Sequence, residues 1–81
     1  MSNKIKVQTE LDLRGVICPY NFVKTKLQLD RMQAGDILAV VLDDGEPIKN
    51  VPQSLRNEGH AVLIQEPYGV HHRILIQKGE D

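Results

Sequence analysis

The chain has 81 residues, of which 41% are hydrophobic and 26% are charged, and its formal net charge is −1. This length predicts a single domain over residues 1–81, with a modest core and an ordered part from about residue 4 to about residue 78. The chain lacks a basic excess, an apolar run near the ~20 residues of a membrane span, and the apolar core of a signal peptide. We therefore expect a cytoplasmic protein that contacts no membrane and does not bind nucleic acid directly.

The first predicted element is a half-buried strand. Apolar residues recur at odd positions from Ile5 to Leu13, and this alternation is typical of a strand with one face on a core. Gly15 breaks the alternation. Pro19 then predicts the start of a helix, because the first helical position does not need an N–H, and it places Cys18 at the helix N-cap.

This first helix is predicted to run to about Met32, after which a glycine ends it. Its apolar pattern is mixed. Phe22, Leu29 and Met32 share one side of a helical wheel, whereas Val23 and Leu27 lie well away from that side. The helix is therefore inferred from its start signal, its length and its terminating glycine.

The middle of the chain predicts a buried strand and a second helix. Residues 37–42 are continuously apolar, which is typical of a strand buried on both faces. Asp43-Asp44-Gly45 follows as a turn. Pro47 opens a helix whose apolar residues recur at helical spacing, and Gly59 lies where its C-terminal cap belongs. Pro52, inside this helix, is expected to kink or restart it.

The last third predicts two strands, at residues 62–64 and 74–76, which pair as a hairpin through a turn at Pro67-Tyr68-Gly69. The resulting order is β-α-β-α-β-β. An α/β two-layer sandwich, with two helices on one face of a four-stranded mixed sheet, suits this order. The β-α-β connections should be right-handed, with their strands parallel.

Cys18 is the only cysteine, so it cannot form an internal disulfide and is either a packed small hydrophobe or a working thiol. At a helix start, the N–H groups of Tyr20 and Asn21 and the helix dipole would favour its thiolate. Arg14 could add positive charge nearby. A free thiol has a pKa of ~8.5, which such surroundings lower. From these residues alone both interpretations remain open.

The stretch from Leu11 to Pro19, Leu-Asp-Leu-Arg-Gly-Val-Ile-Cys-Pro, resembles the signature of the TusA/SirA family. The resemblance continues through Asp43-Asp44 and Val51-Pro52 into residues 73–78, and so covers nearly the whole chain. It implies the two-layer fold described above. It also implies a persulfide carrier, in which the motif cysteine accepts sulfur from a cysteine desulfurase or a rhodanese-like donor.

Carried over to this sequence, the resemblance makes Cys18 the sulfur acceptor and Pro19 the residue that shapes the helix start. Gly15 permits the loop, and Asp12 and Arg14 are supporting motif positions. No metal and no organic cofactor would be required. The partners would be a donor protein and an acceptor protein, in tRNA thiolation, cofactor synthesis or sulfur metabolism.

Lys24, Lys26 and Arg31 on the first helix are candidates for the surface that docks these partners, because charge around the helix start should govern partner choice. A solvated helix face is an equally good interpretation of the three. The family pattern is Cys-Pro-x-Pro, and here Asn21 stands in place of the second proline. Unlike proline, Asn21 has an N–H, which we expect to point at the cap, so the departure concerns the rigidity of this edge and the partner that recognises it.

Two other functions compete with the carrier. A non-catalytic interaction or regulatory module with a structural Cys18 is the main alternative, and direct RNA binding through a basic patch is a third, against which the net charge argues. The histidines do not favour a metal site. Adjacent histidines such as His71 and His72 would face opposite sides of a strand, and no cysteine cluster accompanies them or His60, so they are interpreted as solvated or hairpin-end residues.

Overall fold

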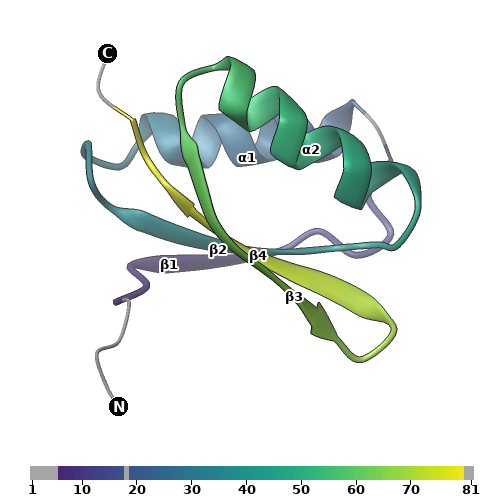
Figure 1. Cartoon of the computed structure of the whole chain (residues 1–81). Coiled ribbons are helices and arrows are strands. Elements are labelled where there is room, and N and C mark those ends of the chain that lie inside the picture. Colours follow the sequence, from purple (N-terminus) through teal and green to yellow (C-terminus); the bar gives the residue numbers. More distant parts are fainter. Residues whose placement is uncertain (1–5, 18, 80–81) are drawn as a thin grey trace.

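The computed structural model describes residues 6–17 and 19–79 of the chain (Figure 1). Cys18 lies outside the described residues, as does the predicted beginning of the first strand at Ile5. The elements are, in order, β1 Thr9–Asp12, α1 Tyr20–Asp30, β2 Ile37–Leu42, α2 Glu46–Asn57, β3 Ala61–Tyr68 and β4 His71–Gln77. Figure 1 shows both helices on one face of the sheet, which confirms the predicted fold class and element order.

The sheet is four-stranded and mixed, with the strand order β1-β2-β4-β3. β1 pairs with β2 in parallel, as expected for two strands joined by a crossover helix, here α1. β4 is antiparallel to both β2 and β3. It therefore lies between them, and β3 runs in the direction of β2 without pairing with it. None of the described helices is long and apolar enough to cross a membrane.

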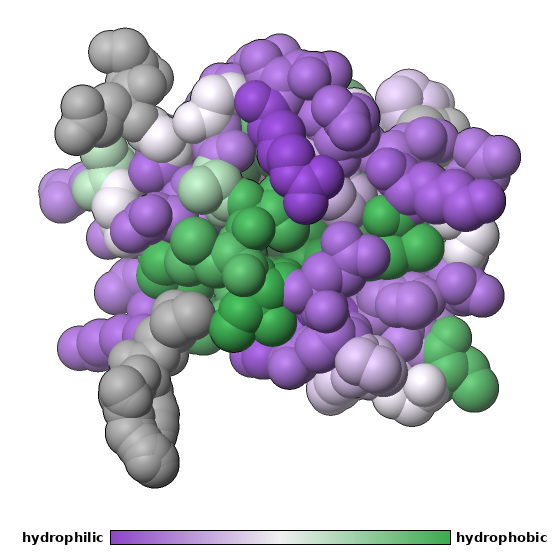
Figure 2. All heavy atoms as spheres, in the orientation of Figure 1, coloured by the Kyte–Doolittle hydropathy of each residue, from purple (hydrophilic) through white to green (hydrophobic). Residues whose placement is uncertain are grey.

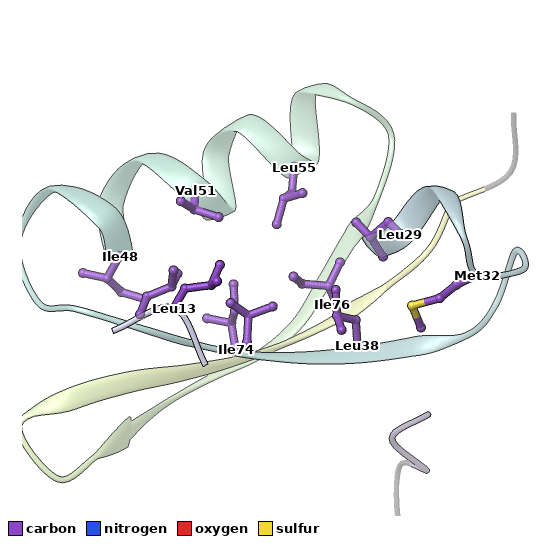
Figure 3. Packing of buried hydrophobic residues seen from close by; sticks show 11 residues of the cluster. Leu13, Leu29, Met32, Leu38, Ile48, Val51, Leu55, Ile74 and Ile76 are labelled. Atoms are coloured by element: carbon purple, nitrogen blue, oxygen red, sulfur yellow. The ribbon is translucent and has the colours of Figure 1, made fainter. Parts of the chain in front are cut away.

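The main core fills the space between the helices and the sheet (Figure 3). Alternate residues of β2 and β4 point into it, and α2 contributes one face at helical spacing. Its buried members are Leu13, Leu29, Met32, Leu38, Val40, Leu42, Ile48, Val51, Leu55, Ile74 and Ile76.

A second, smaller cluster covers the helix-free face of the sheet. Ile37, Ala39 and Leu75 are buried there, and Val7 and Ile64 pack against them. This explains why all six residues of β2 are buried, as its continuous apolar run predicted. Seen from the β3 side, apolar surface gathers midway along the molecule (Figure 2).

The helix boundaries differ from the predicted ones by one or two residues. α1 begins at Tyr20 with Pro19 as its N-cap, and ends at Asp30 instead of about Met32. α2 begins at Glu46, one residue before Pro47, because none of the first four helical N–H groups has an intrahelical acceptor and proline is tolerated there. α2 continues through Pro52 as one element and does not restart.

The hairpin strands are longer than predicted, and the predicted turn is wrong in position. Pro67 and Tyr68 belong to β3, opposite His72 and His71 of β4, and the turn follows them at Gly69. β3 is an edge strand, where proline is tolerated because half of the N–H groups face away from the sheet.

The carboxyl-terminal end of the fold is attached to the segment between α1 and β2. Lys78 N–H donates to the Asp36 carbonyl at 2.9 Å, and its own carbonyl accepts from Gly35 N–H at 2.9 Å. Lys78 Nζ donates to the Met32 carbonyl at 2.7 Å. Residues 32–36 and Lys78 thus form one hydrogen-bonded corner at the start of β2.

Candidate functional site

The candidate site lies where the two parallel strands end. β1 ends at Asp12 and β2 at Leu42, so the segments that follow them leave the same edge of the sheet. Gly15 N–H donates to Asp43 Oδ2 at 2.8 Å and joins the two segments directly. In open α/β sheets the carboxyl edge of parallel strands is the usual place for a site. The chain reaches Cys18 from this edge.

The loop after β1 is built from a buried anchor and a tight turn. Leu13 is buried in the core, and its carbonyl accepts from Val16 N–H at 3.1 Å. Gly15 has a φ of 80°, a left-handed conformation that side chains disfavour, so the expectation that it permits the loop has a physical reason. The loop then turns outward, and Ile17 is 67% exposed.

The start of α1 differs from the expected anion site at one amide. Asn21 N–H donates to the Ile17 carbonyl at 3.2 Å, and Val23 N–H donates to the Pro19 carbonyl at 3.0 Å. The prediction that the Asn21 amide faces the thiolate is therefore wrong. The Asn21 N–H is occupied because its hydrogen bond to the Ile17 carbonyl already has helical spacing, although Ile17 lies before the start of α1.

Asn21 is also fully buried. Its Oδ1 accepts from Phe22 N–H at 2.7 Å, and its Nδ2 lies 3.5 Å from the Val16 carbonyl. A partner protein therefore cannot recognise this side chain at the surface. Sequence reasoning missed its burial because an asparagine near a helix start is normally exposed.

Asp12 and Arg14, the supporting motif positions, form a pair with each other. Arg14 Nε donates to Asp12 Oδ1 at 2.8 Å, its Nη2 donates to Asp12 Oδ2, and its backbone N–H also reaches Asp12 Oδ1. These hydrogen bonds lower the pKa of Asp12 to about 2. The positive charge of the Arg14 guanidinium is thus paired with a neighbouring carboxylate. Both side chains line a cavity of about 250 Å³, together with Glu10, Val41 and Tyr68.

A wider hollow, of about 420 Å³, adjoins the loop that leads to Cys18. It combines apolar surface from the loop with carboxylates from the neighbouring segment. Its lining consists of Gly15, Val16, Ile17, Asp43, Asp44, Glu46 and Pro47. Sequence reasoning read Asp43 and Asp44 as a turn within the family resemblance, and the hydrogen bond from Gly15 shows that Asp43 also shapes this edge.

The histidines of β4 pair with these two aspartates. His72 Nε2 lies 2.9 Å from Asp44 Oδ1, and this hydrogen bond lowers the pKa of the Asp44 carboxyl. His71 Nε2 lies 3.4 Å from Asp43 Oδ1. Among residues 6–17 and 19–79, no three His, Cys, Asp or Glu side chains gather as a metal site.

The three basic docking candidates are not brought together at the helix start. Lys24 is exposed in the second turn of α1, and Lys26 forms an ion pair with Glu58, at 3.9 Å between Nζ and Oε1. Arg31 is the C-cap of α1, ~16 Å along the axis from the start of the helix.

Exposed apolar residues form a row along α1, whereas the three basic residues do not. Tyr20, Val23 and Leu27 are spaced by three and four residues, so they share one face, and they are 59%, 42% and 55% exposed. Ile17 extends this row into the loop. The signal was present in the sequence, since Val23 and Leu27 lie away from the apolar side of the helical wheel.

A family model described as sulfurtransferase TusA matches residues 9–78. The chain belongs to the TusA family. It is 42% identical to "Putative sulfur carrier protein" of Archaeoglobus fulgidus, over 95% of this chain and 89% of that protein. It is 41% identical to "Putative sulfur carrier protein YedF" of Escherichia coli K12, over 84% of this chain and 88% of that protein.

The TusA-family fold is also found among solved structures. The crystal structure of a SirA-like protein from Desulfitobacterium hafniense superposes with a TM-score of 0.76, covering 90% of this chain and 100% of that one. The two sequences are 22% identical, so this likeness concerns the fold. The resemblance stated from the sequence is confirmed at the level of family and fold, whereas the role of Cys18 stays a prediction.

Proposed function

We propose that this chain is a persulfide carrier, which accepts a sulfane sulfur on Cys18 from a donor protein and passes it to an acceptor protein. The observation that carries the proposal is the TusA match over residues 9–78, within which the only cysteine follows the loop from β1 and precedes α1. Relatives with "sulfur carrier" in their names support it.

The proposed reaction exchanges one sulfur atom between thiols. The Cys18 thiolate attacks the outer sulfur of a donor persulfide, the S–S bond of the donor breaks, and the donor leaves as a thiolate. Cys18 then carries the persulfide. In the second step an acceptor thiolate attacks the outer sulfur and releases the Cys18 thiolate. Each step breaks one S–S bond and forms another, so neither metal nor organic cofactor is needed.

The surroundings of Cys18 suit transient docking of two different proteins. Ile17 is exposed directly before it, Tyr20 is exposed shortly after it, and the hollow with Asp43 and Asp44 lies beside the loop. Apolar contacts with a charged rim are typical of protein interfaces. The donor would be a cysteine desulfurase or a rhodanese-like protein. The sulfur would serve tRNA thiolation, cofactor synthesis or sulfur metabolism in the cytoplasm.

Mass spectrometry of the intact protein tests this proposal. The chain is incubated with a cysteine desulfurase and cysteine, and separately with polysulfide. We expect a gain of one sulfur atom, which reductant removes and which Cys18→Ser abolishes while leaving the fold intact. If Cys18 stays unmodified with both donors, the carrier is contradicted, and an interaction module with a structural Cys18 takes its place.

A further inference from the structure

Two polar side chains are fully buried in the part of the chain that the structure describes, and they are neighbours. Asn21 and Thr25 lie one turn apart on the inner face of α1, and Thr25 Oγ1 donates to the Asn21 carbonyl at 2.9 Å. Removing an amide side chain from water costs free energy unless its polar atoms find partners. An apolar residue at position 21 would avoid that cost, so the partners of Asn21 indicate what it does.

Asn21 contacts both residues that precede Cys18. Its backbone N–H donates to the Ile17 carbonyl at 3.2 Å, and its Nδ2 lies 3.5 Å from the Val16 carbonyl. Its Oδ1 accepts from Phe22 N–H at 2.7 Å, which holds the amide plane in place on the helix. The first turn of α1 and the end of the preceding loop are thereby fastened to each other across Cys18.

Neither of these contacts with the loop is available to proline, the residue that the family pattern places at position 21. Proline has no N–H to donate to Ile17 and no side-chain amide to reach Val16. A proline ring restrains its own backbone, whereas Asn21 restrains the loop by binding it. This chain therefore has a different means of fixing the segment that carries its thiol.

We propose that Asn21 is a positioning residue that fastens Val16 and Ile17 to α1 and thereby sets the reactivity of the Cys18 thiol. The helix dipole acts on charges within the first turn, so its effect on a thiolate depends on how firmly the loop is held there. The inference rests on the proposed function only for the identity of the reaction that the Cys18 thiol performs. The positioning itself is measurable without any sulfur donor.

The experiment measures the rate of Cys18 alkylation by iodoacetamide between pH 5.5 and 9.5, in the full chain. Asn21→Ala keeps the backbone N–H and removes both side-chain contacts. We expect the midpoint of its pH–rate profile to rise by ~0.5 unit, so that alkylation at pH 7 is about threefold slower. Asn50→Ala is the matched control, since Asn50 is an exposed asparagine on α2 that contacts Glu46, and it should leave the profile unchanged.

A purely structural role would lower the melting temperature of Asn21→Ala without moving the midpoint, and that result would overturn the proposal. Where Asn21→Ala does not fold, Asn21→Ser gives the same test. Its hydroxyl can accept the Phe22 N–H but cannot reach the Val16 carbonyl as a donor, so the same upward shift is expected.

Sulfur loading is measured in parallel to separate this proposal from the carrier function. If the wild-type chain takes up no sulfur but its pH–rate midpoint still shifts with Asn21→Ala, the carrier function fails and the positioning role stands. If the wild type loads sulfur and the midpoint does not shift, the positioning role fails alone.

Discussion

At the residue scale, the pair of Asp12 and Arg14 shows how a local contact sets a charge. The two side chains are exposed and only two residues apart, yet three hydrogen bonds from Arg14 hold the Asp12 carboxylate. Arg14 lies in the turn that follows β1, and its backbone N–H and its side chain both reach Asp12 without any burial. Because the pair is exposed to solvent, its contribution to stability is small and sensitive to salt.

This pair predicts a shifted titration. The Asp12 carboxyl, whose pKa is lowered to about 2 by hydrogen bonds from Arg14, should titrate near that pH in a carbon-detected NMR experiment. Its folded pKa lies below the unfolded value of ~3.9, so the stability it contributes is present above ~3.9 and is lost as the pH falls through the folded pKa.

Arg14→Ala should return the Asp12 pKa toward its ordinary value, whereas Lys24→Ala should not change it. An Asp12 carboxyl that titrates at an ordinary pKa in the wild type would show that the pair does not form in solution.

How far the site residues could be predicted also differs from residue to residue. The motif was sufficient to single out Asp12, Arg14 and Gly15, because it is contiguous in the sequence. The burial of Asn21 could not be predicted, since it depends on how α1 lies on the sheet. The role of Asp43 was equally hidden, because its contact with Gly15 joins residues 28 positions apart.

At the element scale, the residues on the inner face of α1 explain why its apolar pattern is mixed. Asn21, Thr25 and Leu29 follow one another at intervals of four, and all three are buried. Two of these residues are polar, so a hydrophobic pattern alone could not identify the face. α2 has the opposite character, since apolar residues fill its inner face, and its location was predicted to within one or two residues.

One leucine from each helix provides a matched test of which helix faces are buried. Leu55 of α2 is fully buried, and Leu27 of α1 is 55% exposed. Leu55→Ala should lower the free energy of unfolding by about 2–5 kcal/mol, because it leaves a cavity in the core. Leu27→Ala should change it by no more than about 0.5 kcal/mol. Urea denaturation measures both, and equal losses would mean that the outer face of α1 is packed in solution.

At the scale of the whole molecule, the position of β4 could not be read from the chain order. The hairpin and the parallel pair were both predictable from turn and helix signals. Nothing local states that β4 inserts beside β2 and leaves β3 at the edge. The reason is packing, since Ile74 and Ile76 of β4 join the main core opposite Val40 and Leu38 of β2.

This strand order predicts an uneven resistance to hydrogen exchange. Amides shared between β2 and β4 are covered on both sides of the sheet and should exchange only on global unfolding. β1 is an edge strand of four residues, so its amides should open locally and exchange at least about tenfold faster. Amide exchange followed by NMR checks this, and equal protection of β1 and β2 would contradict it.

The hydrogen-bonded corner at Lys78 determines which end of the molecule an attachment would occupy. β2 starts beside this corner and ends beside Gly15 and Asp43, so the two sites are separated by the length of the strand (Figure 1). A bead, a surface or a fused domain tethered through the carboxyl end would therefore lie at the opposite end of β2 and leave the edge at Gly15 and Asp43 free. Tandem copies linked in this way would each keep that edge open to a visiting protein.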